Sequence, residues 1–539
     1  MKSIKYFLLT GLISLMSLVA CQKQISVYNI RDFGARGDGK FMNTNAINAA
    51  IEKCSNNGGG RVLVPAGKYI SGTIVLMSNV ELHLDPGAVI KGSNDTTDYK
   101  FMKNVLFNEG YTHFGLIFSA FTRNISITGK GTMDGNGMYF MNGIDKPHII
   151  GDYDRKLTRQ GEDFMKPGTQ FEDGPVSYDY RPGMLMFLLS CENVQLEDVF
   201  LTNSPEWTVR IEDCDNVEVR GITIDNDPLI PNNDGIHCTT SRNIRISDCN
   251  VSAGDDAIIV TGFGDLPLPG QFSDSALHNG LPGNKTGYAE NVSVTNCVLS
   301  SRSACVRVGY GNHPVRNLVF SNLVMYNSNR GIGVFSRDNS SIEHVMFDNI
   351  IIHTRLVAGD WWGKGEPIHI SAIQDTENGN PGHIDDITIS NVTATGEAGI
   401  VIFGDKNSLI KNVRMNNIRL SLHGGKYSKS FGGNFDLRPS WPQPYRVFKH
   451  DIPGLYAENV KNLKISGFEM NWNEPVESYF TNAITADHFA GLTIEGFSGG
   501  PSGISNNMPA ILLTNGSDAE LINCKTSSGV LLVSKQNVK

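Results

Sequence analysis

The chain has 539 residues, of which 40% are hydrophobic, 19% are charged and 57 are glycine. Its 46 basic and 55 acidic side chains leave a formal net charge of −9, and no run of Lys and Arg offers the basic surface that a nucleic-acid-binding protein needs, so we expect no nucleic-acid partner. The hydrophobic content excludes a disordered chain. The excess of glycine disfavours an all-helical fold and favours turn-rich β structure.

The first twenty residues have the order of a secretory signal. Lys2 and Lys5 precede an apolar run over residues 6–20 that is too short to span a bilayer comfortably. The run ends in Leu-Val-Ala followed by Cys21, which resembles a bacterial lipobox. We therefore expect residues 1–20 to be removed and Cys21 to be lipidated, so that residues 21–539 are exported and anchored to a bacterial membrane, in the periplasm or at the cell surface. The alternative is an ordinary signal peptide followed by a coincidental cysteine.

Eight further cysteines are spread along the chain without any Cys-x-x-Cys pair, so neither a zinc site nor a thioredoxin-like site is predicted. Cys191, Cys214 and Cys238 recur at spacings of 23 and 24 residues. Free cysteine packs as a small hydrophobic residue, and we expect these thiols to stack in a core.

A short pattern recurs along the chain: Asn, an aliphatic residue, any residue and an apolar residue. Its copies begin at Asn193, Asn216, Asn243, Asn291, Asn317, Asn412 and Asn462, with His344 and Asp386 in the place of Asn in two more. Most consecutive copies lie 23 to 27 residues apart, and the wider gaps of 48 and 50 residues are interpreted as two repeats. Asn tolerates the left-handed conformation of a tight turn, where its side chain can bond to the Asn of the next repeat.

Short strands of alternating polarity, bounded by turn residues and repeated at this length, predict an all-β fold: a single-stranded right-handed parallel β-helix. A β-propeller is the main alternative, but its blades need about 40 to 45 residues and its hairpin signals are missing. Residues 43–54 predict an amphipathic helix that caps the N-terminal end. Segments at about 133–180, 262–288 and 424–453 interrupt the repeat, and we interpret them as loops inserted into one domain, 21–539.

Three aspartates are spaced about one repeat apart. Asp234 lies in Asn-Asn-Asp-Gly-Ile, and Asp255 and Asp256 follow in Gly-Asp-Asp. Adjacent coils are about 4.8 Å apart, so the three carboxyl groups are expected to converge. Crowded like charges raise the pKa of at least one carboxyl, which sets a protonated acid beside an ionised base, as glycosidases require. An inverting glycosidase separates the two carboxyls by about 6.5–9.5 Å. The alternative is that each Asp only caps a turn.

Further motifs accompany the aspartates. They are Phe-Gly-Ala-Arg-Gly-Asp-Gly at 33–39, Gly-Thr-Met-Asp-Gly-Asn-Gly at 131–137 and Asn-Ser-Pro-Glu-Trp-Thr at 203–208. Together these residues resemble glycoside hydrolase family 28, the polygalacturonases and their relatives, from about residue 25 to at least residue 420. The resemblance implies a right-handed β-helix. It also implies that Asp234 and Asp256 position and activate water, while Asp255 protonates the leaving group.

Two motifs of the family are replaced. Its Gly-His-Gly aligns with Ser-Ala-Cys at 303–305, so the His is missing. Its Arg-Ile-Lys, whose cations hold the galacturonate carboxylate, aligns with Gly-Val-Phe at 333–335, so both cations are missing. These departures favour a non-standard sugar, neutral or sulfated, over ordinary polygalacturonan.

Other side chains are candidates for substrate contacts. They are His237, Arg307, His313, Trp361, Trp362, Glu366 and His369. The Trp pair suits stacking on a sugar ring, although it could equally be packing. The insert at 424–453 carries Phe431, Phe435, Trp441, Tyr445 and Phe448, and we expect it to fold over the β-helix.

The sequence thus predicts a monomeric, lipid-anchored inverting glycoside hydrolase without a metal or cofactor, which acts on a plant or algal polysaccharide or its oligosaccharides. The long inserts favour attack at a chain end. Two alternatives stay open: a β-helix polysaccharide lyase, which would need a cation such as calcium, and a glycan-binding surface protein without catalytic activity.

Overall fold

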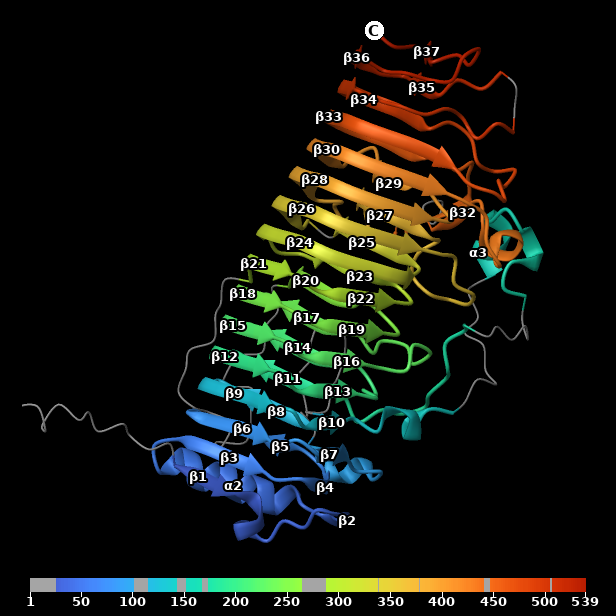
Figure 1. Cartoon of the computed structure of the whole chain (residues 1–539). Coiled ribbons are helices and arrows are strands. Elements are labelled where there is room, and N and C mark those ends of the chain that lie inside the picture. The colour runs from blue at the N-terminus through green and yellow to red at the C-terminus, as the bar shows by residue number, and fades with distance from the viewer. Residues whose placement is uncertain are drawn as a thin grey trace, which may run out of the picture.

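The computed structural model describes residues 26–100, 115–142, 152–166, 173–263, 287–337, 339–377, 379–440, 446–504 and 507–539. These residues form one long stack of parallel strands, with helix α2 at the N-terminal end and the C-terminus at the other end (Figure 1). The predicted signal, Cys21, Trp441 and Tyr445 lie outside the described residues. Within the described ranges, no helix has the length and apolar character needed to cross a membrane.

Each coil contributes strands to three parallel columns. The first column contains β1 (Val27–Asn29), β3 (Gly60–Val64), β6 (Val80–Leu84), β9 (Arg123–Gly129), β12 (Glu192–Glu197), β15 (Asp215–Arg220), β18 (Arg242–Ser247) and β21 (Ala289–Thr295). The second contains β5 (Ile74–Val75), β8 (Ile117–Ala120), β11 (Met186–Leu189), β14 (Val209–Glu212), β17 (Ile236–Thr239), β20 (Ile258–Gly262), β23 (Ala304–Gly311), β25 (Arg330–Ser336), β27 (Glu366–Ala372) and β29 (Ile400–Gly404). The third contains β2 (Asp38–Met42), β4 (Gly67–Ser71), β7 (Ala88–Gly92), β10 (Thr132–Asp134), β13 (Phe200–Thr202), β16 (Thr223–Asp225), β19 (Asn250–Ala253) and β22 (Val298–Ser301).

In the C-terminal half, the first and third columns join into long strands. These are β24 (Val315–Ser328), β26 (Ser341–Thr354), β28 (His383–Gly396), β30 (Leu409–Leu422) and β33 (Leu455–Trp472). The stack ends with β34 (Ile484–Glu495), β35 (Ile511–Thr514), β36 (Ser517–Ile522) and β37 (Val533–Gln536). Strand β24 pairs with both β21 and β22 in parallel register, which shows where the columns merge. The parallel β-helix predicted from the repeat is therefore confirmed.

The repeated Asn forms a ladder at the bend of each coil. Asn193 has a φ of 56° and Asn216 a φ of 57°, in the left-handed region that Asn tolerates. The amide of Asn216 donates to Oδ1 of Asn193 at 2.8 Å, and the amide of Asn193 donates to Asn124 at 3.0 Å. His344 and Asp386 occupy the same conformation at their copies, with φ values of 56° and 55°. The predicted turn chemistry is confirmed.

The core lies inside the coils and is continuous along the stack. One aliphatic row runs through Val194, Val217, Ile244, Val292 and Leu318, which are paired in register on successive coils and buried. Cys191, Cys214 and Cys238 are buried and form no disulfide, as expected of small apolar side chains. Cys191 and Cys214 are neighbours on adjacent coils, but Cys238 lies beside Ile211, so the expected stack is wrong for Cys238. Burial raises the pKa of the Cys238 thiol to about 12.

The N-terminal end of the stack is covered by α2 (Thr44–Asn56), close to the predicted 43–54. Its buried residues Ala46, Ile47, Ala50, Ile51 and Cys54 join the solenoid core. Open coils expose apolar core and strand edges, and this helix removes that exposure at one end.

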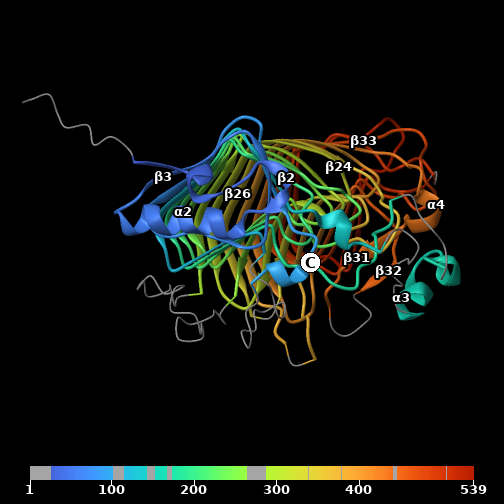
Figure 2. The same ribbon diagram turned by 90° about the horizontal axis from the view of Figure 1, so that it is seen from below.

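Short elements outside the coils gather on one side of the solenoid (Figure 2). They include η3 (Gly137–Phe140), α3 (Asp152–Leu157), η4 (Gly161–Asp163), α4 (Ser428–Phe431), β31 (Asn434–Asp436) and β32 (Val447–Lys449); η1 (Ile30–Phe33) and η2 (Thr96–Asp98) lie near the N-terminus. Arg159 joins two of these segments, since its N–H donates to Asn434 at 2.7 Å and its guanidinium to Asp451 at 2.9 Å. Most of the segment between β20 and β21 lies outside the described residues.

Candidate active site

The three predicted aspartates sit in the turns that lead into the second column. The N–H of Thr208 donates to the carbonyl of Asp234 at 2.8 Å, and the N–H of Gly235 donates to the carbonyl of Asp256 at 2.9 Å. In the same way, the N–H of Ala257 donates to Ala304 at 2.9 Å. Asp234, Asp256 and Ala304 therefore lie on successive coils at one position of the turn.

The glycines beside the aspartates let these turns approach closely. A Cβ atom at Gly235 would lie 2.3 Å from the carbonyl oxygen of Ala257, and one at Gly254 would lie 2.4 Å from that of Ile230. The buried Asn233 side chain ties the two turns together, because its Oδ1 accepts the N–H of Gly254 at 2.5 Å. Close stacking of the two turns therefore requires glycine at positions 235 and 254 and is held by the Asn233 side chain.

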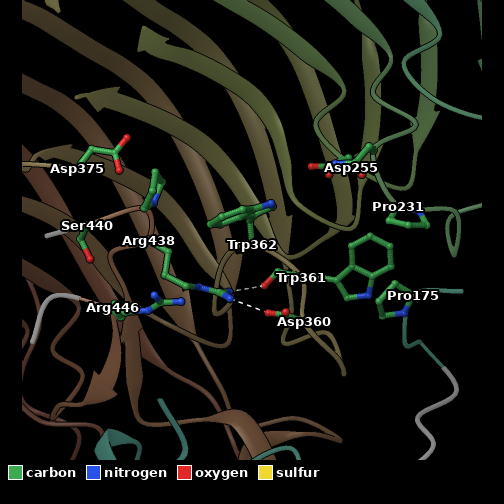
Figure 3. A pocket seen from close by; sticks show the side chains of 12 residues that line it. Pro175, Pro231, Asp255, Asp360, Trp361, Trp362, Asp375, Arg438, Ser440 and Arg446 are labelled. Carbon is green, nitrogen blue, oxygen red and sulfur yellow. Dashed lines mark hydrogen bonds and ion pairs between the residues drawn. The ribbon is translucent and has the colours of Figure 1, made fainter. Parts of the chain in front are cut away.

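The aspartates open into a cleft formed by two adjoining hollows, and Figure 3 shows the first. The first hollow, of about 450 Å³, is lined by Asp255, Trp361 and Trp362. It is also lined by Pro175 of the insert at 133–180 and by Arg438 and Arg446 of the insert at 424–453. The second, of about 340 Å³, is lined by Tyr178, Arg181, Glu206, Trp207, Asn232, Asp234, Asp255, Asp256, Arg307, Tyr310, Arg330, Phe335 and Trp362. Asn232, Asp255 and Trp362 line both hollows, so the carboxyl of Asp255 lies at their junction.

The neighbouring carboxyls of Asp255 and Asp256 have different surroundings. Burial first, and the charge of Asp256 second, raise the pKa of Asp255 to about 7. Asp256 instead has a cation and a backbone donor: its Oδ2 lies 2.7 Å from Nε of Arg307, and its Oδ1 accepts the N–H of Ala304 at 2.8 Å. The pair therefore offers a protonated acid next to a carboxylate.

Cations reach the cleft from positions other than those of the family motif. Arg307, Arg330 and Arg181 all line the second hollow. Arg181 is held by the carbonyls of Pro205 and Pro231 at 3.1 and 2.6 Å. Sequence reasoning missed Arg330 and Arg181. Arg330 could have been placed in the cleft only from the register of the coils, which pairs it with Ala304.

Three predicted contact residues do not line the cleft. His237 is fully buried behind Asp234, with its Nδ1 3.6 Å from Oδ2 of Asp234 and its ring 3.7 Å from that of Trp207. Burial holds the pKa of His237 well below its usual value. Glu366 is fully buried behind Arg330, 3.7 Å from its Nε, and His369 is buried beside Glu366. The predictions that His237 and Glu366 contact the sugar are therefore corrected. The two residues lie on the same strand face as the cleft-lining Arg307 and Arg330, respectively, but the Trp207 ring covers His237 and the Arg330 side chain covers Glu366.

The structure also places Cys305 and His313, which lie near the position of the missing family His in the sequence. Cys305 lies in the core, where burial raises its pKa to about 12, and its Sγ lies 2.9 Å from Oγ of Ser328. His313 lies at the end of β23 and is not among the residues that line either hollow. Neither takes the place of the missing family His.

The Trp pair forms part of the cleft wall. Trp361 is buried and donates its Nε1–H to the carbonyl of Asp173 at 2.7 Å, whereas Trp362 is half-buried and faces both hollows. The guanidinium of Arg438 lies 4.9 Å from the ring centre of Trp362. Sequence reasoning missed Arg438, which belongs to the insert.

A buried ion-pair network fixes this wall. Arg438 bonds to both oxygens of Asp436 at 2.8 and 2.9 Å and to Asp360 at 2.6 Å. Asp436 also accepts the N–H of Gly363 at 2.7 Å. Burial alone would raise the pKa of Asp436, but the Arg438 guanidinium holds it far below its usual range. The insert is thereby joined to the Trp362 loop.

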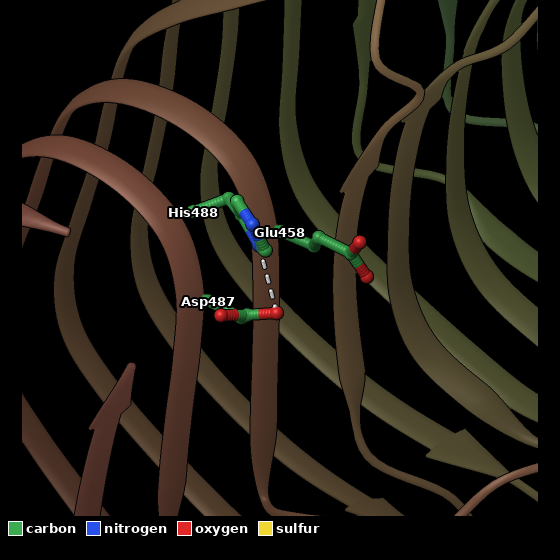
Figure 4. Close-up of side chains that lie close together, drawn as sticks. All are labelled: Glu458, Asp487 and His488. Atoms are coloured by element: carbon green, nitrogen blue, oxygen red, sulfur yellow. Dashed lines mark ion pairs between the residues drawn. The ribbon is translucent and has the colours of Figure 1, made fainter. Parts of the chain in front are cut away.

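One group in the described ranges could hold a metal ion, and it lies away from the cleft. Glu458 on β33, Asp487 and His488 on β34 bring their ligand atoms within 4.8 Å of one another (Figure 4). Asp487 already accepts bonds from Thr514 at 2.6 Å and Asn515 at 2.9 Å. The cluster belongs to coils beyond those of the aspartates.

Family comparisons agree with this geometry. Residues 176–433 match the model for glycosyl hydrolases family 28, and residues 27–150 match the model for rhamnogalacturonase A/epimerase, pectate lyase-like. Residues 176–433 are thus similar to family 28, and the relatives and solved structures that the chain matches are polygalacturonases at low identity. The family 28 segment contains all three aspartates and most of the described cleft.

Individual relatives are distant. The chain is 30% identical over 256 residues to a probable polygalacturonase of Vitis vinifera, covering 45% of each chain. It is 28% identical over 251 residues to an exo-poly-alpha-D-galacturonosidase of Dickeya chrysanthemi, covering 43% of this chain and 41% of the relative. The matched region thus covers less than half the length of each of these two relatives.

Solved structures share the fold. The family 28 exopolygalacturonase of Yersinia enterocolitica superposes with a TM-score of 0.60 at 20% identity, over 88% of this chain and 79% of that one. The polygalacturonase of Erwinia carotovora superposes with a TM-score of 0.53 at 22% identity, over 75% of this chain and 95% of that one.

Proposed function

We propose that the protein is a glycoside hydrolase that acts on a galacturonate-containing, pectin-like polysaccharide or its oligosaccharides. The observation that carries the proposal is the Asp255–Asp256 pair at the junction of two hollows, with a raised pKa on one carboxyl and an Arg cation on the other. The family 28 match and the exo-poly-alpha-D-galacturonosidase relative support the same reaction.

In the proposed mechanism, Asp255 gives its proton to the glycosidic oxygen as the bond to the anomeric carbon breaks. A general acid must touch that oxygen, so the scissile bond lies where the two hollows meet. Asp256 removes a proton from water, Asp234 helps to position that water, and the water oxygen bonds to the opposite face of the anomeric carbon. The product has the inverted configuration, and no cofactor takes part.

An anionic sugar is the proposed substrate in the second hollow. Arg181 and Arg330 line that hollow without an ion pair to the three aspartates within the described residues, so their donors suit a uronate carboxylate or a sulfate group. They supply the cationic character that the aligned motif at 333–335 lacks. The earlier expectation of a neutral sugar thus becomes the less favoured alternative.

We further propose attack at a chain end. Residues of both inserts, Pro175 and Arg438 among them, line the first hollow, and the fixed Trp361–Trp362 loop adds a wall. Such walls favour a pocket over an open groove. Single-sugar or disaccharide products throughout a digestion would support end attack, and an early spread of product lengths would contradict it.

The test of the hydrolase is to incubate residues 21–539 with pectic, galactan and sulfated polysaccharides beside an Asp255→Asn variant. The anomeric configuration of fresh products is followed by NMR. We expect inverted products from a uronate-containing glycan and none from the variant. Unsaturated products would identify a lyase, and equal binding of a glycan by both proteins without products would identify a binding protein.

Export and lipid anchoring at Cys21 are also proposed, as is a monomeric state. The basis is the charged-then-apolar leader and the lipobox-like sequence before Cys21. Labelled fatty acid should be incorporated into the full chain but not into a Cys21→Ala variant. Light scattering of residues 21–539 should give the mass of one chain.

A further inference from the structure

We propose that Arg307 is a positioning residue that keeps Asp256 as the ionised partner of the Asp255–Asp256 pair, so that the one proton of the pair stays on Asp255. The inference rests on the proposed hydrolase function. Arg307 lies outside the three aspartates of that mechanism, and it acts on the reaction through Asp256.

The contacts of the two carboxyls are unequal. Nε of Arg307 lies 2.7 Å from Oδ2 of Asp256, and both side chains are only 9% exposed. The other oxygen of Asp256 accepts the N–H of Ala304 at 2.8 Å. Asp255 instead accepts the N–H of its neighbour Asp256 at 3.0 Å and forms no ion pair within the described part of the chain. The Ser303 hydroxyl and the charge of Arg307 also lower the pKa of Asp255, but burial and the charge of Asp256 outweigh them. Water is largely excluded, so the Arg307 charge acts on Asp256 with little screening.

An aromatic stack holds the Arg307 guanidinium in place. The guanidinium lies 4.6 Å from the ring centre of Tyr310, and Tyr310 stacks on Phe335 with ring centres 5.6 Å apart and planes 28° apart. Cation–π contact and stacking both favour this arrangement.

The stack depends on a glycine. A Cβ atom at Gly333 would lie 2.4 Å from the Phe335 ring, so the ring occupies the space that a side chain at 333 would fill. Strand pairing sets Gly333 directly beside Arg307 on the next coil. Gly333 and Phe335 stand where the family motif has its two cations. The replacement of that motif is therefore the change that lets the aromatic stack orient Arg307.

Other groups around the pair do not supply the same charge. On the preceding coil, the Asp234 side chain cannot carry a positive charge. Burial holds the pKa of His237 low, so this ring is uncharged. On β23, burial raises the pKa of both Cys305 and Tyr310, so both stay uncharged. Arg330, on the following coil, pairs with Glu366 at 3.7 Å.

The test compares Arg307→Gln and Arg307→Lys with Arg316→Gln as a matched control. Arg316 pairs with Glu290 at 2.8 Å on the outer surface and has no part in the cleft. In Arg307→Gln, the acidic limb of the kcat/KM profile should move to higher pH, because the variant lacks the adjacent cation that favours the ionised carboxylate. Arg307→Lys should restore most of the shift, and the control should leave the profile unchanged.

A second measurement needs no substrate. Carboxyl carbons of Asp255 and Asp256, labelled with ¹³C and assigned through Asp→Asn variants, are titrated in the free protein. Titration of the wild-type pair should occur at lower pH than in Arg307→Gln, whether or not any tested glycan is cleaved. A Gly333→Ala variant should move the titration in the same direction by displacing Phe335.

The inference is overturned if Arg307→Gln raises KM while the pH profile and the carboxyl titration stay at the wild-type position, which would make Arg307 a substrate contact. If the wild-type protein cleaves nothing but the titration shifts as expected, the hydrolase proposal fails and the role of Arg307 in the pair stands.

Discussion

Two stacks of polar side chains run along this solenoid, and they have opposite chemistry. At the Asn bend, amides such as Asn193 and Asn216 lie one coil apart, and Asn193 both donates to Asn124 and accepts from Asn216. At the turn before the second column, Asp234 and Asp256 lie one coil apart in the same way, but carboxylates only accept and repel one another. Stacked amides therefore satisfy one another's hydrogen-bonding groups, whereas stacked carboxyl groups need a cation or a proton between them.

The difference explains where cations and protons are found. Amide-to-amide steps of the Asn ladder, such as Asn216 to Asn193, bond without a charged partner at the exposed bend. The aspartate turn is buried, and it keeps Asp255 protonated near neutral pH and sets Arg307 against Asp256. The same stacking of coils thus gives stability at one bend and reactive groups at another.

The largest expected effect comes from Asp255→Asn. It removes the proposed proton donor, and general acids contribute about 10²–10⁴-fold to rate, so kcat should fall by that factor. At pH 7 the melting temperature should not decrease, because the variant also removes a buried group that would otherwise become charged. Steady-state kinetics and thermal unfolding check both parts. A large loss of melting temperature would show instead that Asp255 is needed for the turn.

The next effect is on pH dependence. Asp255 must be protonated to act, and its pKa is raised to about 7, so kcat/KM should fall about tenfold per unit once the pH is well above 7. The folded protein binds this proton more tightly than the unfolded chain, in which the pKa is near 3.8. The contribution of Asp255 to stability is therefore present below pH 4 and lost as the pH rises towards 7. Denaturant titrations of wild type and Asp255→Asn should diverge over that interval.

A smaller effect is expected in the amide stack. Asn193→Ala removes the side-chain hydrogen bonds of this position and leaves an alanine at a φ of 56°. A non-glycine residue in this left-handed region costs about 1–2 kcal/mol. Asn193→Gly removes the same bonds but accepts the conformation, so it should lose less stability. Urea unfolding measures the two free energies, and the kcat of both variants should equal that of wild type. Equal losses in the two variants would show that hydrogen bonding, not conformation, dominates the ladder.

The smallest effect is expected from chelation. Glu458 and Asp487 form a further stack of paired carboxylates, but they lie outside both hollows. Incubation with EDTA should change kcat by less than twofold. A large loss that calcium restores would favour the lyase alternative and would make this cluster, or another cation site, part of the reaction.

The fold could be predicted because its geometry requires particular residues at a fixed spacing. A left-handed bend on each coil favours Asn, and inward strand positions require aliphatic side chains, so residues such as Asn216 and Val217 repeat visibly. The convergence of Asp234 with Asp255 followed from the same spacing, since no insertion separates their coils.

The rest of the site could not be read in this way. Arg307 and Arg330 lie beyond an insertion, and their register with the aspartate turn depends on coil lengths that the sequence does not state. His237 was expected in the cleft and does share a strand face with Arg307, but the Trp207 ring, which comes from the preceding coil, covers it. Arg438 reaches the wall from an insert whose path follows no repeat.

The buried Asp436–Arg438 pair also bears on how the molecule opens. A solenoid in which each coil contacts only its neighbours can unfold locally, one part at a time. Asp436 and Arg438 join a late segment of the chain to Gly363 and Asp360, about 75 residues earlier, through a buried and a partly buried hydrogen bond. Backbone amides around residues 360–364 and 436–438 should therefore exchange with solvent deuterium as one cooperative unit, with a protection that the free loops of a coil would not have.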